Sequence, residues 1–232
     1  MLIAAGPGVG KSLFMLVLAL MSRVPTYYFS ADSGPEIQLE RAISILTGWH
    51  IEETREKIEG KTVGEANDQL AGIPIRFDTS ASPDPDLLEN ELKAYFEVYG
   101  DFPELIIVDN ITNVTGLADN ADDPFSGLES LMDYLSELAR DTEACVVGLH
   151  HVNGAYNDGN TPIPLSGIKG QIGRVPAMVL TLHKETLSDD VLMNVSTVKN
   201  RSGNVDSTGL SSVPLRFVGE RMQITDWDEG ND

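Results

Sequence analysis

Residues 2–12 read Leu-Ile-Ala-Ala-Gly-Pro-Gly-Val-Gly-Lys-Ser and constrain the fold more than any other part of the chain. The four apolar residues predict a short buried strand, and the apolar run that starts at Lys11 predicts a helix that ends near Ser22. Glycines at 6, 8 and 10 let successive backbone N–H groups point at one anion, which the positive end of the following helix also attracts. A strand, a glycine-rich turn and a helix in this order predict a phosphate-binding loop.

The last two residues of the pattern indicate which phosphates are bound. An ammonium group at Lys11 can lie between the β- and γ-phosphates of a nucleoside triphosphate, and the hydroxyl of Ser12 can ligate Mg²⁺. We expect the nucleotide to contact Ala5, Gly6, Pro7, Gly8, Val9, Gly10, Lys11, Ser12 and Leu13.

Two other interpretations of this turn compete with that one. The first is a glycine-rich turn that binds nothing. The second is a dinucleotide-binding fingerprint, because Gly6-x-Gly8 follows a strand and Asp32 ends the next strand, where a ribose-binding acid would lie. The second is disfavoured because Lys11 occupies the third glycine position, at which a dinucleotide-binding helix packs closely on its strand.

The charge balance limits how nucleic acid could be bound. The chain has 36 acidic and 16 basic residues, a net charge of −20. Because lysine and arginine drive phosphate binding, a surface of this kind cannot grip DNA over its whole area. Any contact with DNA must use a few local cations, and most of the acidic surface serves solubility.

Cysteine usage and hydropathy indicate the compartment. The single cysteine, Cys145, lies in an apolar run and is expected to fill the core, since one thiol cannot form an internal disulfide. The longest apolar run, Leu13 to Met21, is far too short to span a membrane. We therefore expect a cytoplasmic protein with no membrane partner.

The remaining chain alternates between predicted strands and helices, which is typical of an α/β fold with a mostly parallel central sheet flanked by helices. Antiparallel strands are expected toward the C-terminus. Further strands are predicted at 26–30, 73–77, 104–109, 144–150, 177–184, 193–199 and 215–218, and further helices at 36–47, 54–70, 87–99 and 125–141. Between them lie an acidic loop at 116–124 and a glycine-rich segment at 154–173, which we expect to be mobile, and an acidic tail at 226–232 follows.

Two aspartates end apolar strands and complete the predicted site. Asp109 follows Leu-Ile-Ile-Val, an arrangement in which the carboxylate holds Mg²⁺ directly or through water. Asp32 follows the strand at 26–30, which we expect to lie next to the strand before the phosphate-binding loop, so its carboxylate can reach a water that attacks the γ-phosphate.

A family resemblance now becomes visible in five segments that occur in a fixed order: residues 5–12, 29–32, 105–109, 146–153 and 198–203. The chain resembles the motor domain of the DnaB-type replicative helicases and also the RepA-type plasmid helicases, which are RecA-like P-loop NTPases. The resemblance covers nearly the whole chain and implies one ATPase domain over residues 1–225. It also implies a homo-hexameric ring that hydrolyses ATP with Mg²⁺ at subunit interfaces and translocates on single-stranded DNA.

The resemblance implies a role for each matching residue. Asp32 takes the position of the catalytic glutamate, a departure by one methylene group. Arg41 matches an arginine that stacks on adenine, and His151 matches the residue that contacts the γ-phosphate, which is glutamine in the DnaB-type proteins. Lys199 and Arg201 lie on one side of a strand and match cations that reach the nucleotide of the neighbouring subunit.

DNA contact is expected from the glycine-rich segment, through Lys169 and Arg174. Two alternative functions are weighed beside the helicase: a RecA-like ATPase that acts as a regulator or recombinase without unwinding, and a nucleotide-binding switch with negligible turnover. Because only four residues form the first strand, we also expect a further N-terminal region that the sequence lacks.

Overall fold

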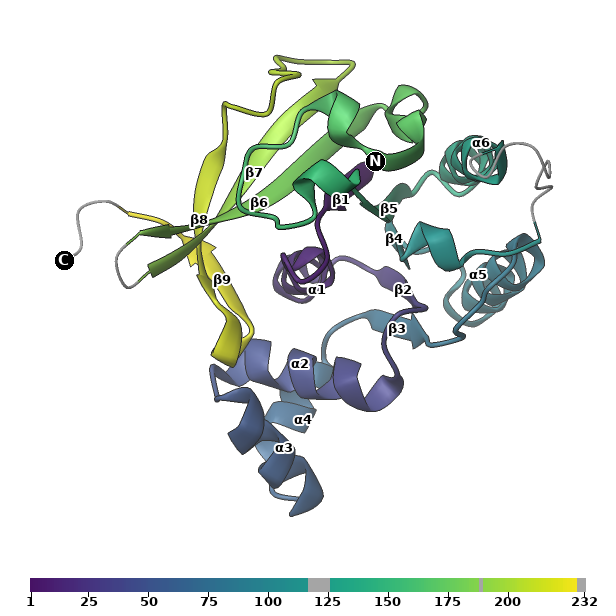
Figure 1. Cartoon of the computed structure of the whole chain (residues 1–232). Coiled ribbons are helices and arrows are strands. Elements are labelled where there is room, and N and C mark those ends of the chain that lie inside the picture. Colours follow the sequence, from purple (N-terminus) through teal and green to yellow (C-terminus); the bar gives the residue numbers. More distant parts are fainter. Residues whose placement is uncertain (117–125, 188–189, 229–232) are drawn as a thin grey trace.

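The computed structural model describes residues 1–116, 126–187 and 190–228. Its centre is a single nine-stranded sheet with the strand order β3-β2-β4-β5-β1-β6-β7-β8-β9, in which the first strand lies in the middle (Figure 1). Strands β1 to β6 pair in parallel, and β6 to β9 pair antiparallel. The predicted mixed α/β fold with an antiparallel C-terminal part is therefore confirmed.

Nine strands form this sheet. Their bounds are β1 Leu2–Ala5, β2 Thr26–Ser30, β3 Ile75–Asp78, β4 Leu105–Asp109, β5 Cys145–His151, β6 Met178–Leu187, β7 Asp190–Asn200, β8 Val213–Val218 and β9 Gln223–Asp226. Strand β9 was not predicted, and it ends at the first residue of the predicted acidic tail. Residues 229–232 of that tail lie outside the described residues.

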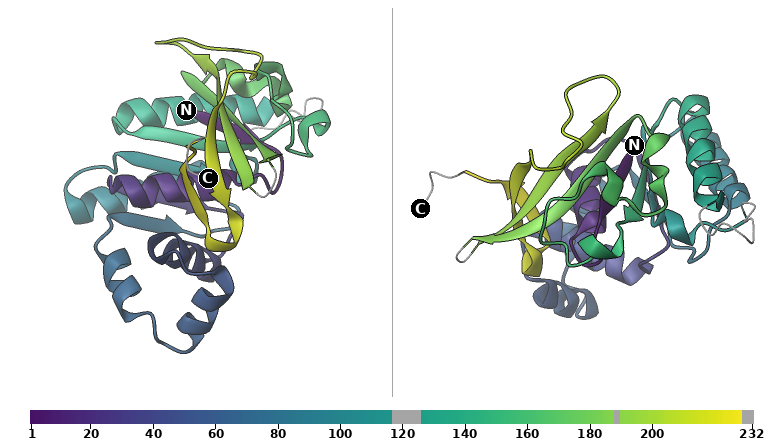
Figure 2. Two further views of the ribbon diagram at one scale, coloured as in Figure 1. Left: turned by 90° about the vertical axis from the view of Figure 1, so that its left-hand side faces the viewer. Right: turned by 45° about the horizontal axis from the view of Figure 1, so that its top comes forward.

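Alternating side chains of the buried strands build two separate cores, because successive residues of a strand face opposite sides of the sheet. In β1, Leu2 and Ala4 join one core and Ile3 and Ala5 the other. The first core packs against the helices α5 (Pro85–Tyr99) and α6 (Ser126–Asp141), and the second against α1 (Lys11–Ser22) and α2 (Pro35–Thr47). Helices thus cover both faces of the sheet (Figure 2).

The prediction of one continuous helix at 54–70 is wrong. The chain makes two short helices there, α3 (Ile51–Glu59) and α4 (Gly64–Ala71), separated by a turn in which Lys61 has a positive φ of 54°. Both lie beside α2 at one end of the molecule (Figure 1). The polar sequence of this region has no apolar stripe from which the break could be placed.

The expectation that Cys145 fills the core is wrong. Cys145 is exposed, because its place at the start of β5 leaves the thiol outside the packed face.

The glycine-rich segment forms short 3₁₀ helices, η2 (Gly154–Tyr156), η3 (Leu165–Gly167) and η4 (Lys169–Arg174). Most of the predicted acidic loop, from residue 117 on, lies outside the described residues. Among the described helices, none has both the length and the apolar character to cross a membrane.

Candidate functional site

The phosphate-binding loop is shaped by two glycines and filled by one lysine. Gly8 and Gly10 have φ angles of 73° and 110°, which side chains rarely allow. Gly10 precedes α1, and no described side chain caps that helix, so its first N–H groups are left for an anion. The buried Nζ of Lys11 donates to the carbonyl oxygens of Ala5 (3.1 Å) and Gly6 (3.2 Å). The loop is therefore preformed around its lysine.

A second segment of the chain covers the loop. A Cβ atom on Gly6 would lie 2.6 Å from the carbonyl oxygen of Asn157, so only glycine fits at position 6. Lys184, at β6, donates from Nζ to the carbonyl oxygen of Gly8 (3.1 Å) and lies 3.8 Å from the ring centre of Phe217. Lys184 was not among the predicted site residues, because a lysine at the end of a predicted strand carries no signal of what it contacts.

Asp109 and Ser12 lie where a hard cation would be held. The Asp109 carboxylate is 2% exposed and accepts hydrogen bonds from the Ser12 hydroxyl and, at 2.8 Å, from the Tyr28 hydroxyl. Burial raises the pKa of Asp109, while the two hydroxyl donors and the nearby ammonium of Lys11 oppose the rise. A buried carboxylate beside a hydroxyl fits Mg²⁺, which prefers one or two protein oxygens and completes its shell with water and phosphate. No cluster of three acidic, histidine or cysteine ligands occurs among the described residues.

Asp32 is brought to the same place, although by a different route from the one expected. Strand β2 does not lie next to β1, because β4 and β5 separate them. The expectation of adjacent strands is therefore wrong. The exposed carboxylate of Asp32 nevertheless acts electrostatically on Lys11, Asp109 and His151. All these parallel strands end at one edge of the sheet, so the residues that follow them meet there.

His151 ends β5 and bonds to a residue that was not predicted from the sequence. Its Nε2 atom lies 2.6 Å from Nδ2 of Asn110, which is 1% exposed and directly follows Asp109. Because Oδ1 of Asn110 accepts the backbone N–H of Thr112 (3.2 Å), its amide N–H₂ group faces His151. The Nε2 atom must then be the acceptor, so His151 is neutral and carries its proton on Nδ1. Burial, and then the charge of Lys11, lower the pKa of His151 in agreement with this state.

His150 turns the other way, as expected for neighbours on a strand. It is fully buried, and burial lowers its pKa to about 4, so it is neutral at physiological pH. Its Nε2 lies 2.9 Å from the backbone carbonyl oxygen of Lys169, which can only accept, so Nε2–H is the donor. The histidine pair thus links the nucleotide side of the sheet to η4.

Of the other predicted residues, Arg41 lies beside this centre. Lys199 lies near the opposite edge of the sheet, because it pairs with Val179 and Val179 pairs with Leu2 at the start of β1. Arg41 donates to the Ser33 hydroxyl (3.2 Å), beside Asp32. Lys199 lies on β7 and Arg201 lies just after its end at Asn200; both donate to backbone carbonyls of residues 173–175. The side chain of Lys169 is exposed. Arg174 is also exposed and pairs with Glu129 of α6 at 3.2 Å.

Comparison with known proteins places this site in a family. A sequence model of the DnaB-like helicase C-terminal domain matches residues 1–226. The gene 65 proteins of Mycobacterium phages D29 and L5 are 58% and 57% identical to this chain, which covers 99% and 85% of their lengths; the matches span 98% and 97% of this chain.

Two solved structures share the fold at 16% sequence identity, each over 98% of this chain. One is an ATPase domain (TM-score 0.83, 84% of that chain covered), and the other is a DnaB-like replicative helicase studied with primase (TM-score 0.84, 57% covered). Through its matching sequence the chain belongs to the DnaB-like helicase C-terminal domain family, and it is the ATP-hydrolysing motor domain of a helicase.

Proposed function

We propose that the site binds Mg²⁺-ATP and hydrolyses it at the interface between two copies of this chain. The observation that supports this proposal most directly is the convergence of Lys11, Asp109, Asp32 and His151 at one edge of the sheet. Lys11 and the free amides of the loop bind the β- and γ-phosphates, and Ser12 and Asp109 would hold Mg²⁺. The ion, when bound, neutralises charge on the phosphate oxygens.

Hydrolysis requires a base and a group that responds to the γ-phosphate. Asp32 orients a water molecule and accepts its proton as oxygen attacks the γ-phosphorus and the bond to the β-phosphate oxygen breaks. The neutral His151 offers Nδ1–H as a hydrogen-bond donor to the γ-phosphate. Arg41 serves the nucleotide base by stacking.

The cations of β7 complete the reaction from a neighbouring copy. Lys199 and Arg201 would reach the neighbour's nucleotide and stabilise charge in the transition state, an effect of about 10³–10⁵ on the rate in related chemistry. A hexameric ring satisfies this requirement for every copy, since a head-to-tail interface closes by rotation. The ring would place Lys169 and Arg174 around a channel for single-stranded DNA.

Mixing two inactive variants tests the shared site. Lys11→Ala lacks its own phosphate contact and Arg201→Ala lacks the cation it supplies to its neighbour, so each alone should hydrolyse little ATP. In a head-to-tail ring each site takes its phosphate-binding loop from one copy and the cation from the next copy. In an equal random mixture, about a quarter of the interfaces therefore combine an intact loop from an Arg201→Ala copy with an intact cation from a Lys11→Ala copy. Restored turnover in the mixture supports the proposal. Turnover no higher than the sum of the separate variants would contradict it.

Binding of single-stranded DNA is tested by its salt dependence. Each lost phosphate contact reduces the slope of log affinity against log salt by about 0.7 for single strands. Lys169→Ala should therefore weaken binding and flatten this slope, whereas Lys93→Ala, an exposed lysine on α5 paired with Glu89, should change neither. ATP turnover that single-stranded DNA does not stimulate would favour a regulator without helicase activity.

A further inference from the structure

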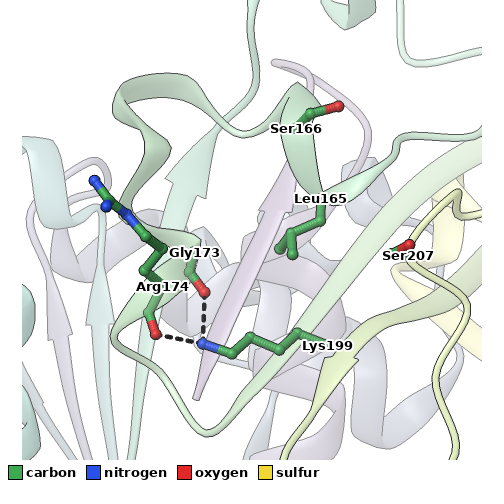
Figure 3. Close-up of a pocket in the computed structure, with 6 residues that line it drawn as sticks. All are labelled: Leu165, Ser166, Gly173, Arg174, Lys199 and Ser207. Carbon is green, nitrogen blue, oxygen red and sulfur yellow. Dashed lines mark hydrogen bonds between the residues drawn. The ribbon is translucent and has the colours of Figure 1, made fainter.

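The segment between η3 and β6 is held by side chains from two different strands. On one side, His150 of β5 donates to the carbonyl of Lys169. On the other side, Lys199 of β7 donates to the carbonyls of Gly173 (2.9 Å) and Arg174. Figure 3 shows the Lys199 ammonium group between these two carbonyls, with the Arg174 side chain pointing away. Residues 169–175 are thus attached both to the strand that ends at His151 and to the strand that carries the cations proposed to act in trans.

Arg201 strengthens the second attachment. One of its guanidinium nitrogens donates to the carbonyl oxygen of Val175 at 2.9 Å, and a longer contact of 3.5 Å reaches Arg174. Three consecutive carbonyls, at 173, 174 and 175, therefore accept hydrogen bonds from Lys199, which lies on β7, and from Arg201, which lies just after that strand. These contacts fix the backbone of the segment just before β6 begins at Met178.

Within the part of the chain that the structure describes, no carboxylate forms an ion pair with either of these two cations. Of the ion pairs recorded between described residues, none includes Lys199 or Arg201. Burial lowers the pKa of Lys199, and the positive charge of Arg201 lowers it further. Their hydrogen-bond partners are neutral carbonyl oxygens, although the chain as a whole has 36 acidic residues and only 16 basic ones. Two adjacent cations that no described carboxylate pairs with form a site that attracts an anion.

There is room for an anion beside Lys199. A cavity of about 620 Å³ opens next to its ammonium group, lined also by the hydroxyl-bearing Ser166 and Ser207 and by Leu165 (Figure 3). An ammonium group has three N–H donors, and two of them are directed at the carbonyls. A phosphate oxygen carries a negative charge, so it adds a charge–charge attraction that a neutral carbonyl oxygen does not offer to the ammonium group. The carbonyls would then be the weaker competitor for these cations.

We propose that Lys199 and Arg201 are exchangeable positioning residues: without a neighbouring nucleotide they hold residues 173–175, and the phosphates of a nucleotide on a neighbouring copy draw them away and release the Lys169–Arg174 segment. The proposal rests on the trans role in the proposed function and adds a second role in cis. His150 keeps its contact, so the segment stays attached at Lys169 while its other end becomes free. Coupling of this kind is reciprocal, so occupancy of the released segment by DNA strengthens the contact in trans.

Hydrogen exchange of the peptide that covers residues 168–177 tests the cis role without any nucleotide. In the isolated chain, Lys199→Met and Arg201→Met should each raise its exchange rate several-fold, because the carbonyl contacts are lost. Lys199→Arg keeps a cation at this position and should preserve protection. The matched control is Lys169→Met. It removes a cation from the same segment, but the side chain of Lys169 is exposed, so the exchange rate should stay unchanged. Equal rates in all variants would overturn the proposal, even if the mixing experiment succeeded.

The exchange itself is tested in the assembled protein with Mg²⁺ and a non-hydrolysable ATP analogue. Wild-type protein should then show a rate at residues 168–177 that approaches that of the nucleotide-free Arg201→Met variant. Assemblies built only of Lys11→Ala copies present no bound nucleotide, so their segment should stay protected. If residues 168–177 stay protected in wild-type assemblies with the analogue bound, the release of the segment by nucleotide is refuted. If Lys199→Met and Arg201→Met raise the exchange rate but the mixing experiment restores no turnover, only the trans role is refuted.

Discussion

Asn110 determines the protonation of His151, and its replacement by leucine isolates that contribution. The leucine has a similar volume but offers no N–H₂ group to Nε2 of His151 and no oxygen to the Thr112 amide. A hydrogen bond that favours the neutral imidazole is worth about 0.5–1.5 kcal/mol. Its loss should raise the pKa of His151 and allow the proton to occupy either ring nitrogen. ATP turnover should fall, because the Nδ1–H donor that we propose contacts the γ-phosphate is no longer fixed.

The stability cost of the same substitution follows from two lost contacts. Asn110 also caps the short 3₁₀ helix η1 (Ile111–Asn113) through its oxygen, and such caps contribute about 0.5–2 kcal/mol. Together with the histidine contact this predicts a loss of roughly 1–3 kcal/mol in the free energy of unfolding. Urea titration measures this loss, and nitrogen-15 spectra of the His151 ring report its tautomer and titration. Asn113→Leu is the matched control, since Asn113 has no contact with His151 in the described structure.

The nitrogen-15 spectra of the two proteins should differ in a definite way. In the wild-type protein His151 should show its proton on Nδ1 throughout the neutral range, and in Asn110→Leu it should show a mixture with a higher pKa. If the tautomer and the pKa of His151 are the same in both proteins, Asn110 does not set the state of the ring. In that case a lower turnover of the variant would have to come from the displacement of Asp109.

Three further substitutions are expected to have distinct effects. Gly6→Ala places a methyl group 2.6 Å from the carbonyl oxygen of Asn157, so nucleotide affinity should fall at least tenfold, as measured by fluorescence of a labelled ATP; unchanged affinity would show that the segment yields. Asp109→Asn removes a carboxyl whose pKa is raised in the folded state. The contribution of this carboxyl to wild-type stability falls as pH rises above its ordinary pKa of 3.8. In urea titrations without Mg²⁺ the variant should therefore gain stability relative to wild type as pH rises, and a constant difference would contradict this. Lys184→Met should cost about 1 kcal/mol of stability and weaken nucleotide binding, while Lys57→Met, which also loses a cation–ring contact, should cost stability alone.

The helices and strands could be predicted from the sequence, because each buried strand is a short continuous apolar run and each covering helix has an apolar stripe. The order of the strands in the sheet could not. Nothing in residues 26–30 indicates that β2 pairs with β3 and β4 rather than with β1, since pairing depends on how crossover helices pack on the whole sheet. The exposed position of Cys145 had the same cause: an apolar neighbourhood in sequence does not fix which end of a strand is covered.

Some residues of the candidate site could likewise be predicted from the sequence, and others could not. Residues at or just after the ends of apolar strands, such as Asp32, Asp109 and His151, could be predicted because the carboxyl ends of parallel strands lie at one edge of the sheet. Tyr28 and Asn110 could not, since each matters through a partner that is distant in sequence: the Tyr28 hydroxyl reaches Asp109 and the Asn110 amide reaches His151. A tyrosine in a buried strand and an asparagine after it are common in any α/β protein, and only the folded arrangement assigns them to the nucleotide site.

Lys199 and Arg201 have a consequence that their spacing alone could not predict. A separation of two residues on a strand predicted that both cations point to one side. Both do reach the same segment, although Arg201 lies just after the end of β7 at Asn200. The acceptors of those cations are backbone carbonyls of residues 173–175, and a backbone carbonyl has no sequence signature. Before a neighbour arrives, these two cations are held by the segment that carries Arg174. The cost of withdrawing the cations from that segment is therefore part of the energetics of assembly, and it links ring closure to the state of the proposed DNA-binding residues before any DNA is bound.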